Sequence, residues 1–150
     1  MSHSFCNLLY HIVFSTKDRQ PWLEADMPAR LYSYLGGIVR EHGGIPIVIN
    51  GMPDHVHLLV KLGQDEALSY VVRALKSISS RWIREQLPSL ASFEWQTGYG
   101  AFTVSESQAP RVEQYILNQE QHHRERPFQH EFMALLRANG IRVDESDFWD

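Results

Sequence analysis

Apolar and polar positions recur along this chain with two different periods, and the periods separate strands from helices. Runs of four to eight aromatic and β-branched residues favour strands, whereas apolar residues three and four apart favour helices. The predicted elements, in order, are strand 5–14, a helix from Asp26 to Gly43, strands 45–50 and 55–62, a helix from Asp65 to before Pro88, strand 101–104, a helix from Ser107 to about His123, and a helix from Pro127 to near Gly140. This order predicts an α+β protein: an antiparallel sheet with helices packed on it, close to ferredoxin-like.

Cap and turn residues support these boundaries. Asp65 and Ser107 are side chains that can cap a helix, and Pro110 suits the first turn of the helix after Ser107. The turn 51–54, Gly-Met-Pro-Asp, separates the two central strands and predicts a hairpin.

The chain length of 150 residues predicts a single domain, 1–150, with 141–150 as an acidic C-terminal tail. The net charge is −4, but residues 142–150 hold four acids and one arginine, which is −3, so the other 141 residues carry only −1. The overall charge therefore does not exclude a nucleic-acid partner.

Nothing in the composition indicates export or a membrane. Cys6 is the single cysteine, so no internal disulfide can form. No apolar run approaches the roughly 20 residues that span a bilayer, and a basic leader is missing. We expect a cytoplasmic protein without a membrane partner.

The first group with chemical potential is His55-Val56-His57. Alternate residues of a strand share one face, so both imidazoles project together while Val56 points to the opposite layer. Two adjacent imidazoles can chelate a divalent metal. Taken alone, such a pair is more often two ordinary histidines at the end of a strand.

The second group is Tyr115 with Gln119. Residues four apart lie on one face of a helix, so these side chains are neighbours. A phenol can act as a covalent nucleophile, and an amide oxygen is a hard ligand that suits magnesium or manganese. Taken alone, the spacing is typical of an amphipathic helix with a packed tyrosine.

Together the two groups resemble the HUH superfamily of single-strand nucleases, and in particular its small insertion-sequence-200-like transposases with one catalytic tyrosine. The similarity covers most of the chain. The segments that carry it are LLYHIVFSTK at 8–17, GMPDHVHLLV at 51–60, LKSISSRW at 75–82, WQTGYGAFTVS at 95–105 and YILNQEQHH at 115–123.

The resemblance implies a HUH nuclease fold and a set of roles. His55, His57 and Gln119 match the ligands of a divalent metal, Mg²⁺ or Mn²⁺, and Tyr115 matches the nucleophile. Such enzymes cleave and rejoin single-stranded DNA at hairpin-forming element ends through a 5′-phosphotyrosine. A homodimer is also implied, in which the tyrosine helix of one subunit completes the metal site of the other; the sequence leaves open whether the site forms within or between chains.

Further polar residues are candidates for supporting roles. Asp54 could orient a histidine, and Trp95 or Tyr99 could stack on bases. The candidate DNA contacts are Lys17, Arg19, Arg73, Lys76, Arg81, Arg84 and His122.

Three alternatives remain at this level. A replication initiator or relaxase would use similar chemistry, a non-catalytic single-strand or hairpin DNA-binding protein could derive from a transposase, and an unrelated metal-binding domain would leave Tyr115 without a role. The chain has no glycine-rich phosphate loop of the GxxxxGK type, so no nucleotide cofactor is expected.

Overall fold

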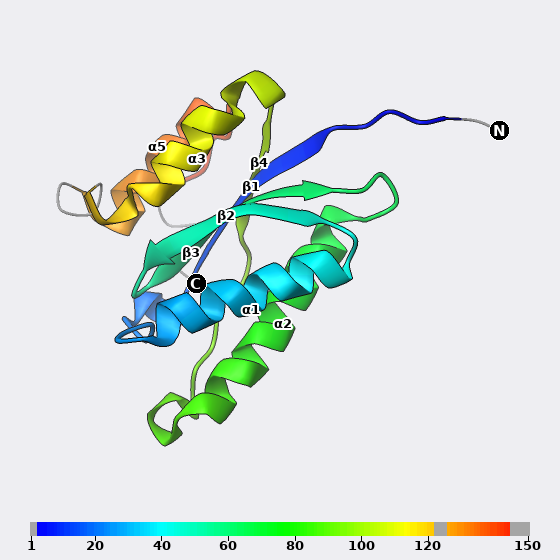
Figure 1. Ribbon diagram of the computed structural model, residues 1–150. Helices are drawn as coiled ribbons and strands as arrows, with labels where there is room; N and C mark the ends of the chain where they lie inside the picture. The colour runs from blue at the N-terminus through cyan, green and yellow to red at the C-terminus, as the bar shows by residue number, and fades with distance from the viewer. Residues whose placement is uncertain (1–2, 122–125, 145–150) are drawn as a thin grey trace.

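A four-stranded antiparallel sheet forms the centre of the computed structural model, which describes residues 3–121 and 126–144 (Figure 1). The strand order is β2-β3-β1-β4. The strands are β1 (Leu8–Ser15), β2 (Ile45–Met52), β3 (His55–Leu62) and β4 (Gly100–Val104). The sheet and the helices on it confirm the predicted α+β class.

Helices cover both faces of the sheet. One face carries α1 (Met27–Glu41) and α2 (Leu68–Gln86), and the other carries α3 (Ala109–Leu117) and α5 (Phe128–Ala138) (Figure 1). Short 3-10 turns lie at Lys17–Arg19, Pro88–Leu90 and Glu106–Gln108. None of the helices in the described part of the chain is long and apolar enough to cross a bilayer.

Alternate side chains of β3 point to opposite faces of the sheet, and the two faces differ in character. Val56, Leu58 and Val60 belong to the main core, which α1 and α2 complete. The alternate residues His55 and His57 are also fully buried, but they point toward α3 and α5. The predicted opposition of Val56 to the two histidines is therefore confirmed.

A second, smaller apolar cluster seats α5 against the sheet. It joins Val13 and Phe102 of the sheet to Phe128 and Leu136 of α5. Phe132 packs so closely over Gly100 that a Cβ atom there would lie 2.6 Å from its ring. The missing side chain of Gly100 thus allows α5 to approach the sheet.

Two predicted helix starts are wrong by two or three residues. Asp65 lies in a turn, and α2 begins at Leu68 after Ala67, whose backbone carbonyl accepts hydrogen bonds from the amides of Tyr70 and Val71. Ser107 lies inside a 3-10 turn, and its hydroxyl is paired with Ser105. Backbone turns, rather than side-chain caps, therefore start both helices.

The helix predicted from Ser107 to about His123 is interrupted. It ends at Leu117, and helical residues resume at 119–121; His122 and His123 lie outside the described residues. At this interruption the Asn50 amide of β2 donates to the carbonyls of Ile116 and Leu117 at 2.9 and 3.3 Å. A side chain from a distant strand thus satisfies carbonyls that a continuous helix would use itself.

Most of the acidic segment 141–150 also lies outside the described residues.

We expect Gly51→Ala to lower the free energy of unfolding by about 2–3 kcal/mol. A Cβ atom at Gly51 would lie 2.2 Å from the carbonyl oxygen of His55 and 2.9 Å from the Cα of Val56, both backbone atoms that cannot rotate away. Gly37→Ala in α1 is the control, because a Cβ atom there meets nothing within 4 Å. It should raise stability by about 0.5–1 kcal/mol. Urea unfolding of both variants measures the contrast, and equal midpoints would contradict it.

Candidate metal and nucleophile site

Two buried imidazoles lie side by side at the start of β3. His55 and His57 have exposed fractions of 0 %, and their ring centroids are 5.1 Å apart. Antiparallel pairing places Ser15 and Val13 of β1 opposite them. The pairing of β3 with β2 and β1 therefore holds the backbone of both histidines in place.

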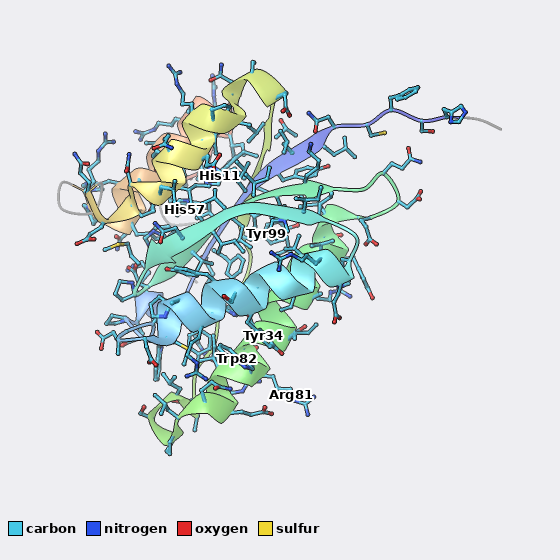
Figure 2. The ribbon with its side chains drawn as sticks, viewed as in Figure 1. His11, Tyr34, His57, Arg81, Trp82 and Tyr99 are labelled. Atoms are coloured by element: carbon cyan, nitrogen blue, oxygen red, sulfur yellow. The ribbon has the colours of Figure 1, made fainter. Side chains whose placement is uncertain are left out.

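The Nδ1 atom of each imidazole ring has its own partner. His55 Nδ1 lies 2.7 Å from Asp54 Oδ1, and His57 Nδ1 lies 2.8 Å from Nε2 of His11. His11 is itself buried on β1, and Figure 2 shows it beside His57 on the side of the sheet that carries α3. Partners at Nδ1 hold both rings so that the two Nε2 atoms face one region.

Three further side chains converge on that region. Gln119 Oε1 lies 3.1 Å from His55 Nε2, and Glu131 Oε1 lies 3.1 Å from His57 Nε2 and 3.5 Å from His55 Nε2. The Tyr115 hydroxyl donates to the other carboxylate oxygen of Glu131 at 2.6 Å. The structure thus brings together His55, His57, Tyr115 and Gln119, all four residues that the sequence singled out, within one chain.

Burial and charge shift the protonation of these groups in different directions. Burial alone would lower the pKa of His55, but the carboxylates of Asp54 and Glu131 outweigh it and raise that pKa to about 9. Burial and the neighbouring His57 lower the pKa of His11 to about 3, so its ring is neutral. Burial, followed by the Glu131 carboxylate, raises the pKa of the Tyr115 phenol well above its usual range. The phenol is therefore protonated at neutral pH.

The donor atoms fit a divalent metal ion. Ligand atoms of His55, His57 and Glu131 lie within 4.8 Å of one another, and all three side chains are buried. Two imidazole nitrogens with carboxylate and amide oxygens form a mixed set suited to a divalent metal ion. A cavity of about 260 Å³ lies beside Tyr115 and Glu131 and is lined by both residues.

Sequence reasoning missed Glu131 and His11. Glu131 carries a usable signal, because it lies three residues after Phe128 and four before Leu135, on the apolar face of its helix. Acidic residues are almost never buried on such a face unless they are paired. His11 likewise interrupts an apolar strand, within LLYHIVF, at a buried position.

The candidate DNA contacts lie mostly on the opposite side of the sheet. An open groove of about 860 Å³ is lined by Lys17, Arg73, Lys76, Arg84 and Tyr99, among others. Arg81 projects from α2 away from the sheet and forms an ion pair with Glu85 at 3.5 Å (Figure 2). Arg19 instead lines a cleft with Asp54 and Phe128, next to the histidines. His122 lies outside the described residues.

Several of these cations are already engaged within the chain. Lys76 donates to the carbonyls of Gln96 and Gly98, both at 2.6 Å, and Arg84 donates to that of Phe93 at 3.1 Å. Trp95 is buried and donates to the hydroxyl of Ser79, so it belongs to the core, whereas Tyr99 remains 40 % exposed. Lys76 and Arg84 thus shape the loop that forms one wall of the groove.

Comparison with known proteins gives one consistent family. Residues 4–119 match the family described as "Transposase IS200 like". The ISDra2 transposase TnpA of Deinococcus radiodurans is 32 % identical over 117 residues, which is 75 % of this chain and 84 % of that protein.

Solved structures agree with this comparison. A Deinococcus radiodurans R1 protein assigned as a transposase superposes with a TM-score of 0.63 at 29 % identity, over 79 % of this chain and 95 % of the other. A REP-associated tyrosine transposase bound to a REP hairpin has a TM-score of 0.61 at 16 % identity, over 82 % and 74 % of the two chains. The second similarity is one of fold.

We expect the His55→Ala, His57→Ala double variant to lose manganese binding in titration calorimetry, because it removes both nitrogen ligands. Gln119→Ala should bind manganese more weakly, by at least about tenfold, and recover at high metal concentration. His42→Ala is the control, since that ring packs against Tyr70 at 5.4 Å, away from the site. Unchanged affinity in the double variant would refute the assignment.

Proposed function

The chain belongs to the IS200-like transposase family, and from this premise we propose that it cleaves and rejoins single-stranded DNA at the ends of an insertion element through a 5′-phosphotyrosine intermediate. One observation carries the proposal. One carboxylate, that of Glu131, contacts both the Tyr115 hydroxyl and the two buried imidazoles. A tyrosine that only filled core space would not need its hydroxyl at this place.

The chemistry follows from the groups at that hydroxyl. Tyr115 Oη attacks the scissile phosphorus, a bond between phosphorus and Oη forms, and the bond from phosphorus to the 3′-oxygen breaks. The phenol proton leaves to Glu131 Oε2, which already accepts it in a hydrogen bond of 2.6 Å, and the departing 3′-oxygen takes a proton from solvent. A divalent ion at His55, His57 and Gln119 would supply Lewis-acid polarisation of the phosphate.

The reaction is reversible because the phosphotyrosine retains the energy of the phosphodiester. A 3′-hydroxyl from another strand end can attack the same phosphorus, release Tyr115 and take back its proton. Strand transfer therefore requires no nucleotide cofactor, in agreement with the missing phosphate loop.

The DNA partner is proposed to be single-stranded, with hairpin-forming ends. A tyrosine transposase of the same fold has been solved bound to a REP hairpin. In this chain, the groove offers the cationic Arg73 and the aromatic Tyr99 for phosphates and bases. Lys17 also lines the groove, where it forms an ion pair with Glu94 at 2.9 Å. We also propose that the protein acts in the cytoplasm, where such a DNA substrate would be found.

We expect Tyr115→Phe to abolish the covalent protein–DNA adduct while the fold and single-strand binding persist, because one oxygen is removed and ring packing is kept. Tyr70→Phe is the control, since Tyr70 is 57 % exposed on α2 and should react normally. Denaturing electrophoresis measures the adduct, and mass spectrometry locates it. A nucleotide attached to any residue other than Tyr115 would contradict the mechanism.

We also propose that the protein is a homodimer, and light scattering tests this. We further propose that each subunit uses its own tyrosine. Tyr115 and Gln119 contact Glu131 and His55 of the same chain. Heterodimers of Tyr115→Phe with His57→Ala should therefore remain inactive, since neither subunit holds a complete site. Recovery of about half the wild-type activity in isolated heterodimers, which would then hold one intact site of two, would show instead that the tyrosine helix crosses between subunits.

A further inference from the structure

The carboxylate of Glu131 is shared between the imidazoles and the nucleophile. Its Oε1 lies 3.1 Å from His57 Nε2 and 3.5 Å from His55 Nε2, while Oε2 accepts from the Tyr115 hydroxyl at 2.6 Å. The side chain is only about 6 % exposed. A buried carboxylate costs several kcal/mol unless cations or donors compensate it.

Several nitrogen and oxygen atoms that carry lone pairs lie close together beside the Glu131 carboxylate. Because Asp54 and His11 lie at the Nδ1 atoms, the two Nε2 atoms face Glu131 Oε1, and Gln119 Oε1 approaches from the other side. Two nitrogens and two oxygens that can each donate an electron pair thus meet in one small volume. Only protons or a metal cation between them can make this arrangement favourable, and a divalent ion that binds there replaces protons.

Packing holds α5 in place independently of the carboxylate. The Phe128 ring stacks on the His55 ring, with centroids 4.2 Å apart, and Phe132 covers Gly100. Glu131 lies between these two anchors on the same helical face. This helix follows the stretch 4–119 that matches the family, so Glu131 lies outside the matched region.

We propose that Glu131 is a fourth protein ligand of the divalent ion, and that its second carboxylate oxygen holds the Tyr115 hydroxyl next to that ion. The inference rests on the proposed metal-dependent function and adds a residue from α5 to its site. An octahedral ion with four protein ligands keeps about two positions for phosphate oxygens or water. Glu131 would then set the distance between nucleophile and metal.

The test measures metal affinity and chemistry separately. Manganese binding is determined by calorimetry without DNA for the wild type, Glu131→Gln, Glu131→Ala and His57→Ala. Adduct formation with single-stranded DNA is followed in single turnover at saturating manganese. Glu113→Gln, which changes a half-buried carboxylate on α3, is the matched control, and thermal unfolding verifies that each variant is folded.

We expect Glu131→Gln to bind manganese at least about tenfold more weakly and to form adduct more slowly even when metal is saturating. Glu131→Ala should show both losses in larger measure, and Glu113→Gln should behave as wild type. The loss of affinity without DNA separates a ligand from a residue that acts on Tyr115 alone.

Two results would overturn the inference. If Glu131→Gln binds manganese as tightly as wild type while His57→Ala does not, Glu131 is no ligand and the proposed function stands. If Glu131→Ala forms adduct faster than wild type, the carboxylate obstructs the site instead of building it. Should the wild type bind no manganese, or His57→Ala bind it equally well, the proposed metal-dependent function itself fails.

Discussion

The burial of two imidazoles on one strand is the constraint on which the rest of this structure depends. His55 and His57 have no solvent to satisfy their ring nitrogens, so each nitrogen needs a protein partner or a metal. Asp54 and His11 contact the two Nδ1 atoms, and Gln119 and Glu131 contact the two Nε2 atoms. These partners come from the hairpin, from β1 and from two helical segments, so the whole arrangement of elements on that face serves one pair of side chains.

The sheet makes this concentration of polar groups tolerable because its other face provides the main core. Large apolar residues of α1, α2 and the central strands gather there, whereas the cluster that seats α5 is small. Side chains that build the main core and side chains that build the candidate site thus alternate along the same strands and lie on opposite faces of the sheet. A substitution at Val56 and one at His57 are one position apart, yet they act on different properties.

The sequence predicts those parts of the fold and of the site that depend on local periodicity. The shared face of His55 and His57 follows from the period of two, and the proximity of Tyr115 and Gln119 from four-residue spacing, although the helix breaks between them. The contacts of Asn50 at that break, and those of Glu131 and His11, depend on packing between distant segments. Likewise, Lys76 gives no sign in the sequence that loop carbonyls occupy its amine.

The position of Glu131 also bears on how reactivity is controlled. A phenol in a short hydrogen bond to a buried carboxylate is a poor nucleophile, because burial and the adjacent negative charge both raise its pKa. A divalent ion beside that carboxylate adds positive charge close to the hydroxyl and opposes both effects. The positive charge of an ion held by His55, His57 and Glu131 would therefore favour transfer of the Tyr115 proton, which burial and the Glu131 carboxylate alone disfavour.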